Sequence, residues 1–371
     1  MVTLNGYHNY GNRLQNYALQ EVLKSQGFTV ETLVVDNLPS NSEGRARKLI
    51  EKVKTLKGKS ISEVSRVVYA KVSDTIYKSE YKNSRMIRTE KFKEFTELYI
   101  NETEYSISDN NIPEDIADRY DYFVVGSDQV WNPYYTKGSP IYFLGFAPRD
   151  RRFSYAASFG ISQIPHEYRE LYQRGLLDME YLSVRENDGS RIIRELTGID
   201  VPVHVDPTLL LTKEQWLAIS KQASNKPKGT YVLTYFLGGI PENHRNQIKN
   251  MAKANSLEVI NLGDIREKET YRTGPGEFID YINDCALFCT DSFHGAVFSI
   301  LLRKPFIVYE RTDYAMFSRL STLLEKFNLQ SRKIEKIDNI EDAFKIDFSH
   351  ILTILEAERN KSVDYLRNCL A

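Results

Sequence analysis

The segment that decides the fold is an apolar run, a short polar loop and a second apolar run, with the sequence ALFCTDSFHGAVFSILL at residues 286–302. The first run, 286–290, has the length of a buried strand, and the second, from about Gly295 to Leu302, has the length of a helix. A strand that passes into a helix within a few residues is typical of a parallel α/β sheet.

The pattern continues on both sides of this segment. We expect strands at 231–237, 257–262 and 306–309, and helices at 241–254, at 277–283 and up to about Phe327. These elements predict a doubly wound domain at 221–347. A helix at 348–370 would follow it, and we expect this segment, 348–371, to pack back on the first half of the chain.

The first half shows the same alternation of strands and helices. Short apolar runs at 2–4, 29–35, 122–125, 153–158, 181–185 and 203–206 read as strands, and helical segments follow the first of them and begin again at 188. The fold class is therefore α/β, with two Rossmann-like doubly wound domains, the first at 1–220. Ligands of such sheets bind at the carboxyl ends of the strands, so we expect a cleft between the domains.

Residues 43–97 differ from the rest of the first half. They are poor in Gly and Pro, and residues 41–100 hold 15 Lys and Arg against 8 Asp and Glu. This composition predicts a helical insertion with a basic face. A solvated surface is the simplest interpretation, and docking to a membrane surface or to a polyanion is the alternative.

Composition excludes several classes of protein. A net charge of -1 gives no reason to expect nucleic acid as a partner. Cys285, Cys289 and Cys369 lack the spacing of a zinc site, and we expect buried, reduced thiols and no metal. No run approaches the ~20 apolar residues of a membrane span, and no signal peptide is visible, so we expect a cytoplasmic protein.

The loop between the two runs at 286–302 is the strongest candidate for chemistry. The free N–H groups at the start of a helix favour an anion such as phosphate. Ser292 can cap the helix, His294 can donate to phosphate or pass a proton near neutral pH, and Gly295 would let a ligand approach the backbone. A capped helix with a partly buried histidine is the competing interpretation.

Polar side chains also follow the strands of the first half. Arg185 can bind a carboxylate or phosphate through its planar guanidinium, or can form a surface pair with Glu186. Around the other strand ends, the candidates for binding sugar hydroxyls or stacking on a sugar are Asn9, Asn12, Gln15, Ser127, Asp128, Gln129 and Trp131. Trp131 can equally belong to the core, and Asp128 can cap a turn.

Common catalytic motifs are missing from the sequence. No G-x-G-x-x-G, G-x-S-x-G, P-loop or H-E-x-x-H pattern appears, which argues against a dinucleotide cofactor, a serine hydrolase of the common kind, a P-loop enzyme and a zinc protease. We expect no cofactor.

Several segments together resemble the polysaccharide pyruvyl transferase family. They occur in the family's order and are YGNRLQNYALQ at 10–20, VGSDQVW at 125–131, SYAASFG at 154–160, SVRE at 183–186, VDPT at 205–208 and DSFHG at 291–295. The resemblance implies a two-domain fold like that of GT-B glycosyltransferases. It also implies phosphoenolpyruvate as the donor co-substrate, a sugar of a bacterial surface polysaccharide or its lipid-linked precursor as the acceptor, and a cyclic pyruvate ketal as the product.

The resemblance also assigns roles. It implies donor binding by Arg185 and His294, to which the loop residues Ser292, Phe293 and Gly295 are added. Where some members of the family read Arg-Leu-His, this chain reads Ser-Phe-His at 292–294, so another cation would replace the missing arginine, with Arg311 and Arg319 as candidates. The hypothesis makes His294 the general acid and base, Arg185 the clamp and Asp128 the second-choice base. A lipid-linked acceptor would place the enzyme at the inner face of the membrane.

Two other functions fit the same elements. A GT-B glycosyltransferase that uses a nucleotide sugar would need a carboxylate for the ribose late in the second half, and Glu310 and Asp313 are available. A non-catalytic saccharide-binding or scaffold protein is the other alternative, against which the many polar strand ends argue.

Overall fold

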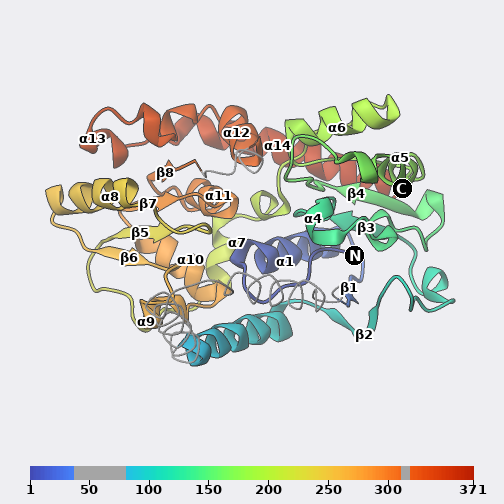
Figure 1. Cartoon of the computed structure of the whole chain (residues 1–371), viewed down its shortest axis with the longest axis horizontal. Helices are drawn as coiled ribbons and strands as arrows, with labels where there is room; N and C mark the ends of the chain where they lie inside the picture. The colour runs from blue at the N-terminus through green and yellow to red at the C-terminus, as the bar shows by residue number, and fades with distance from the viewer. Residues whose placement is uncertain (37–80, 311–317) are drawn as a thin grey trace, which may run out of the picture.

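The computed structural model describes residues 1–36, 81–310 and 318–371 of the chain. Parallel sheets lie towards the two ends of the longest axis, and helix α1 (Tyr10–Ser25) lies between them (Figure 1). The prediction of an α/β fold is confirmed.

The sheet of the second half contains four parallel strands in the order β6-β5-β7-β8. In chain order this is 2-1-3-4, an arrangement of doubly wound sheets. All four residues of β7 are buried, as expected of a strand covered on both faces. The strands are β5 (Val232–Tyr235), β6 (Val259–Asn261), β7 (Leu287–Thr290) and β8 (Phe306–Val308).

The longer helices of the second half agree closely with the predicted ranges, whereas two short helices, Lys268–Tyr271 and Ile340–Ala343, were not predicted. Helix α11 begins at Phe293, two residues earlier than expected, because the side chain of Ser292 caps it. The helices are α8 (Glu242–Ala254), α9 (Lys268–Tyr271), α10 (Pro275–Asp284), α11 (Phe293–Leu302), α12 (Ser318–Lys326) and α13 (Ile340–Ala343).

The strands of the first half form one parallel array through the chain start. Leu33 N donates to Met1 O and Val2 N donates to Val124 O, so Val2 joins the β1-β2 pair to the β3-β4 pair. The strands are β1 (Thr32–Val35), β2 (Glu102–Ile107), β3 (Phe123–Gly126) and β4 (Arg152–Tyr155), and the helices are α4 (Pro133–Thr136), α5 (Arg169–Leu177), α6 (Asn187–Thr197) and α7 (Lys213–Ala218).

Three of the predicted strands are only isolated bridges. The expected strands at 2–4, 181–185 and 203–206 pair through single residues, among them Val2, Val184 and Val203. In the segment 181–185, serine hydroxyls replace backbone hydrogen bonds of the strand ladder. Ser183 N donates to Ser154 Oγ, and Ala156 N donates to Ser183 Oγ. The chain therefore runs parallel to β4 without forming a regular strand.

Two helices connect the halves. Helix 81–99, the described part of the predicted insertion, extends below α1 and α10 (Figure 1), and its Lys91 pairs with Glu277 of α10 at 2.7 Å. Helix α14 (Ser349–Cys369) reaches the first half, where Arg359 donates to Leu209 O and Tyr365 donates to Ser154 O. The remainder of the insertion, 43–80, lies outside the described residues.

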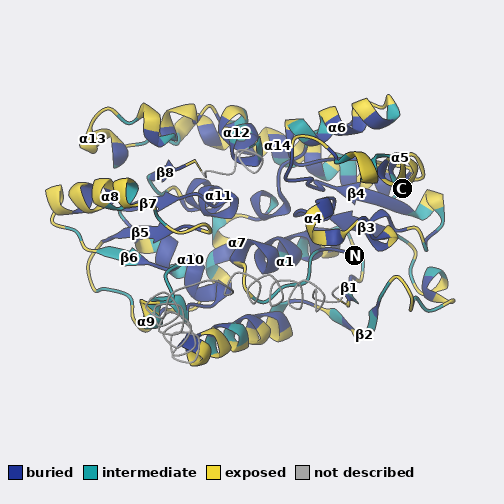
Figure 2. Cartoon of the chain, in the orientation of Figure 1, coloured by how far each residue is buried: buried dark blue, intermediate teal, exposed yellow. Residues whose placement is uncertain are grey.

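One hydrophobic cluster spans the molecule and fixes the site between the sheets. It contains residues from α1, helix 81–99, α10, α11 and α14. Every residue of α11 is buried, and in Figure 2 this helix is surrounded by other elements. Cys285, Cys289 and Cys369 are buried and unpaired, as predicted, and burial raises the pKa of each thiol to about 12. In the described part of the chain, no helix is long and apolar enough to span a membrane.

Candidate active site

A cavity of about 250 Å³ lies between the two sheets, and we call it the central cavity. Its wall combines the residues that follow β3 with those that follow β5, β7 and β8, together with the start of α12. The lining residues are Asn9, Asp128, Gln129, Tyr135, Leu237, Asp291, Ser292, Phe293, His294, Tyr309, Arg319 and Leu320.

Two helix N-termini meet at the central cavity, and each has a side-chain cap. Asn9 caps α1, where its Oδ1 accepts from Gly11 N at 3.0 Å. Ser292 caps α11, where its Oγ accepts from Gly295 N at 3.3 Å. Both capping residues line the cavity. Because a helix carries partial positive charge at its N-terminus, the pair favours an anionic ligand.

His294 lies in the first turn of α11, between the two helices. Its Nε2 lies 3.5 Å from Asp206 Oδ2, an ion-pair distance rather than a short hydrogen bond. Its Nδ1 faces α1, because a Cβ added to Gly11 would lie 1.8 Å from that atom. The absence of a side chain at Gly11 therefore makes room for the imidazole.

Asp206 lies behind His294 and is fully buried. Its Oδ1 accepts from Thr208 N and Oγ1, at 3.1 and 2.7 Å, and its Oδ2 accepts from Ser127 Oγ at 3.1 Å and from Arg185 at 2.5 Å. Burial alone would raise the pKa of Asp206, but His294, Arg185 and Thr208 outweigh it and hold the pKa far below the ordinary value. The carboxylate is thus a fixed negative charge that can stabilise an imidazolium.

Asp128 occupies a left-handed turn, with φ of 63°, after β3. Its Oδ2 accepts from Asn12 Nδ2 at 3.3 Å, and its Oδ1 lies 3.4 Å from Arg185 Nη2. Burial would raise the pKa of Asp128, yet the charges of Arg185, His294 and Arg319 lower it below the ordinary value. A carboxylate with a lowered pKa is a weak base, which favours hydrogen bonding to a hydroxyl over removal of its proton.

Arg185 is buried behind the cavity wall, outside the set of lining residues. Its guanidinium contacts both Asp206 and Asp128 and lies over the ring of Phe293, with Cζ 4.5 Å from the ring centroid. The proposed donor clamp is therefore engaged with two carboxylates of the protein. Arg319 of α12 lines the cavity directly, and Arg311 lies outside the described residues.

The predicted acceptor residues divide into two sets. Asn9, Asp128 and Gln129 line the central cavity. Behind the wall, the Nδ2 of Asn12 is bound to Asp128, Gln15 Nε2 donates to Thr3 Oγ1 at 2.8 Å, and the hydroxyl of Ser127 is bound to Asp206.

Two sequence-based roles need correction. Trp131 is fully buried, donates from Nε1 to Tyr142 O at 2.9 Å and packs against Phe143 and Phe159, so its ring has no face for a sugar. Gly295 does not serve close ligand approach, because a Cβ there would meet Thr290 Oγ1 at 2.7 Å. Its role is to let α11 start close to β7.

Sequence reasoning missed several residues at the site. Asp206 belongs to the VDPT segment at 205–208, one of the segments that resemble the family. That resemblance was the only sequence signal that could have identified it. Tyr135 lines the cavity and is half exposed. It lies four residues after Trp131, the residue for which stacking on a sugar was predicted. Asp291 accepts from Leu237 N at 2.8 Å and so ties the loop after β5 to the start of α11.

Residues suited to a metal are not grouped in the described part of the chain, where no cluster of three or more His, Cys, Asp and Glu side chains occurs. The central cavity combines groups that favour an anion, namely helix N-termini, an imidazole and a guanidinium, with the carboxylates of Asp128 and Asp291.

Comparison with known families gives a match over most of the chain. The model of the family described as polysaccharide pyruvyl transferase matches residues 9–313, a range that includes all of the cavity-lining residues up to Tyr309. No curated protein matches the chain.

Proposed function

Since this chain belongs to the polysaccharide pyruvyl transferase family, we propose that it moves the pyruvyl group of phosphoenolpyruvate onto a sugar and forms a cyclic ketal. The observation that carries the proposal is the position of His294 in the first turn of a capped helix, beside an anion-favouring cavity and in front of an ionised Asp206. Phosphoenolpyruvate carries a phosphate and a carboxylate, and ketal formation requires proton transfers. The cavity supplies groups for both.

Donor binding involves the second-half wall of the central cavity. The backbone N–H groups at the start of α11, the hydroxyl of Ser292 and the guanidinium of Arg319 face the phosphate and carboxylate. In this proposal Arg319 takes the place of the cation that relatives carry at position 292. Arg185 acts as a positioning residue, because it holds Asp206 and Asp128 at the site.

The reaction proceeds through two additions at the same carbon. His294 donates a proton to the methylene carbon of phosphoenolpyruvate, and the first sugar hydroxyl attacks the resulting cationic carbon and returns its proton to His294. The carbon–oxygen bond to phosphate then breaks, and the bonding electrons leave with the phosphate. The second hydroxyl attacks the same carbon and gives its proton to the departing phosphate, which completes the ketal.

The surroundings of the two ring nitrogens define the orientation of His294. Nε2 faces Asp206, and Nδ1 lies against Gly11 in the first turn of α1, beside the central cavity. The carboxylate of Asp206, 3.5 Å from Nε2, holds the ring in this orientation. Asp128 orients an acceptor hydroxyl as a hydrogen-bond acceptor.

Acceptor binding involves the first-half wall. Tyr135 of α4 lines the central cavity and has 50% of its surface exposed, so its ring offers the apolar face for a sugar that Trp131 does not. Asn9, Asp128 and Gln129 supply hydrogen bonds nearby. A surface polysaccharide or its lipid-linked precursor fits this open side, and a lipid-linked acceptor would place a cytoplasmic enzyme at the inner membrane face.

The two halves serve as the two domains of a GT-B-like enzyme in this proposal. The first, 1–220, binds the acceptor, and the second, 221–347, binds the donor, with the C-terminal helix returning to the first. The two parallel sheets and the cavity between them support this division.

The test is release of inorganic phosphate from phosphoenolpyruvate across a panel of saccharides, with mass spectrometry of the products. We expect acceptor-dependent phosphate release and a saccharide that has gained one pyruvate ketal. Thermal stabilisation by a nucleoside diphosphate, without stabilisation by phosphoenolpyruvate and without ketal product, would contradict the proposal and favour a nucleotide-sugar glycosyltransferase.

A further inference from the structure

A second cavity, of about 400 Å³, lies at the carboxyl ends of β5 and β6, and we call it the arginine cavity. The loop 236–240 separates it from the central cavity, because Phe236 lines the arginine cavity while the next residue, Leu237, lines the central one. The other lining residues are Arg85, Gly239, Ile240, Arg245, Asn261, Gly263, Asp264, Ile265, Arg266 and Tyr271.

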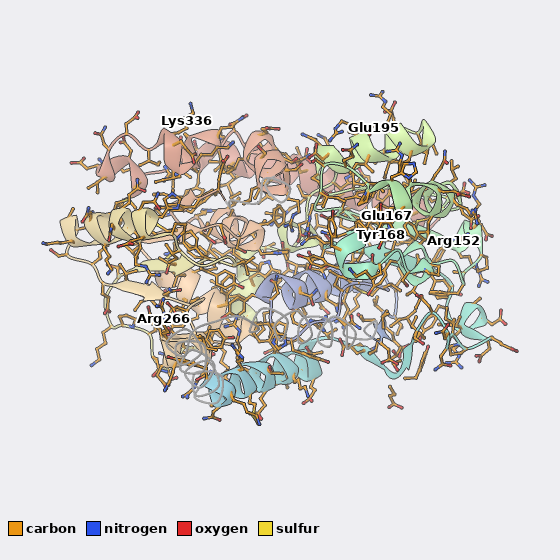
Figure 3. All side chains as sticks on the ribbon, viewed as in Figure 1. Arg152, Glu167, Tyr168, Glu195, Arg266 and Lys336 are labelled. Carbon is orange, nitrogen blue, oxygen red and sulfur yellow. The ribbon has the colours of Figure 1, made fainter. Side chains whose placement is uncertain are left out.

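Three arginines from three different segments surround the arginine cavity. Arg85 comes from helix 81–99, Arg245 from α8, and Arg266 from the turn before α9, where it is labelled in Figure 3. Arg266 is paired with Asp264, with Nε 2.8 Å from Oδ1. Among the described residues, neither Arg85 nor Arg245 is within ion-pair distance of a carboxylate, although the charge of Arg245 helps Arg266 to lower the pKa of Asp264.

Positive charge therefore exceeds negative charge at this cavity. Its lining contains three guanidinium groups and one carboxylate, that of Asp264. Glu267 is the next acid along the chain, and desolvation together with the charge of Asp264 raises its pKa above the ordinary value. Ile240 also places the positive end of α8 at the rim, since the next residue, Pro241, occupies the N-cap position of that helix and has no side-chain hydrogen bond to it.

The backbone of the loop 236–240, at the rim of the arginine cavity, is accessible to a ligand. Gly239 has φ of 82°, and a Cβ built there would meet no atom within 4 Å. An anion can thus approach the loop 236–240 from the side opposite the central cavity. Planar guanidinium groups that converge from several directions suit a phosphate, which offers oxygens on all sides.

We propose that the arginine cavity binds a phosphate group carried by the acceptor saccharide. The proposal rests on the proposed function, because it assigns the central cavity to the sugar that receives pyruvate. The arginine cavity lies across the loop 236–240 from the central cavity, and its Arg85 comes from the half of the chain that the proposed function assigns to the acceptor. The site thereby selects phosphorylated saccharides over neutral ones.

The first experiment measures binding without turnover. Inorganic pyrophosphate is titrated calorimetrically into the full chain with phosphoenolpyruvate at saturation and no saccharide present, so that the central cavity is filled. We expect one binding event that weakens about tenfold or more in Arg85→Ala and in Arg245→Ala. Arg174→Ala is the matched control, since Arg174 is 80% exposed and pairs with Glu170 on α5. Equal affinity in all variants, or no binding, would overturn the site.

The second experiment identifies the source of the phosphate. Initial rates are compared for a sugar 1-phosphate and for the same free sugar, in the wild type and in Arg245→Ala. We expect the KM advantage of the sugar phosphate to fall about tenfold in the variant, while the KM for phosphoenolpyruvate is unchanged. Pyrophosphate binding by the arginines without any change in that advantage would assign the site to free phosphate and reject the acceptor proposal.

Failure of the proposed function has a separate signature. A wild type that releases no phosphate from phosphoenolpyruvate with any saccharide would refute pyruvyl transfer. The calorimetric result would still decide whether the arginine cavity binds phosphate.

Discussion

The two walls of the central cavity use charge in different ways. On the first-half side, the buried guanidinium of Arg185 lies between the carboxylates of Asp128 and Asp206. On the second-half wall, Ser292, His294 and Arg319 face the cavity itself. The difference supports the proposal that the ion pairs of the first-half wall position side chains and that the polar groups of the second-half wall bind the anionic donor. A charged residue at a strand end is therefore not by itself a ligand-binding residue.

The largest expected effect comes from Gly11, where the two walls touch. In Gly11→Ala the new Cβ would lie 1.8 Å from His294 Nδ1 and displace the imidazole. We expect kcat to fall about 10²–10⁴-fold, the usual value of a positioned general acid or base. Steady-state phosphate release measures it.

Gly6→Ala is the matched control for this substitution. A Cβ at Gly6 meets only Asn12 Oδ1, at 3.7 Å, which is an ordinary contact. Activity of Gly11→Ala equal to that of Gly6→Ala would mean that the imidazole position does not matter for the reaction.

Asp206→Asn tests whether the buried ion pairs behind the first-half wall stabilise the fold. The substitution leaves the buried Arg185 with one weak partner, Asp128 at 3.4 Å, and removes the counter-charge of His294. We expect the free energy of unfolding to fall by about 3–5 kcal/mol, as for other broken buried ion pairs. Urea denaturation followed by circular dichroism gives the value.

The exposed pair of Arg174 and Glu170 provides the comparison, since both side chains are at least 80% exposed. Glu170→Gln should change stability by no more than about 0.5 kcal/mol. A similar small loss in Asp206→Asn would show that the buried network contributes little.

Tyr135→Ala tests the acceptor side of the cavity. Loss of a half-exposed aromatic face should raise the acceptor KM about fivefold, or about 1 kcal/mol, and leave the KM for phosphoenolpyruvate unchanged. Tyr134→Ala is the control, because Tyr134 is 61% exposed but does not line the cavity. Equal acceptor KM values for the two variants would contradict a platform at Tyr135.

Acidification gives the smallest expected effect. The folded pKa of Asp128 is lower than its unfolded value of about 3.9, so its contribution to stability is present above about pH 4 and is lost as pH falls through the folded pKa. The stability difference between wild type and Asp128→Asn should therefore shrink between pH 6 and pH 3. Thermal unfolding at several pH values measures it, and a constant difference would exclude a lowered pKa.

Local sequence patterns predicted much of the fold. The helices α8 and α14 and the capped start of α11 follow from apolar spacing and from Ser292, all of which are local signals. The segment around Val184 was expected to be a strand but is only bridged, because serine hydroxyls replace ladder bonds there. That exchange depends on the partner Ser154, which a local pattern does not reveal.

The candidate site was predictable in part. His294, Ser292 and Asp128 line the cavity as expected. Trp131 and Tyr135 are four residues apart in the same polar segment, and only tertiary packing decides which of the two rings is buried. The pairing of Arg185 with Asp206 likewise arises from neighbouring segments of the array, so the sequence alone suggested a ligand-binding guanidinium or a surface pair with Glu186 where the fold contains a buried ion pair with Asp206.

Single-turnover phosphate release tests the central claim most directly, namely that His294 on the second wall carries the chemistry. Wild type and His294→Ala are each mixed with phosphoenolpyruvate and one saccharide that the wild type converts to a ketal. The account predicts rapid, saccharide-dependent release in the wild type and release slowed at least 100-fold in His294→Ala, with phosphoenolpyruvate still bound. Equal release rates in the two proteins would contradict it.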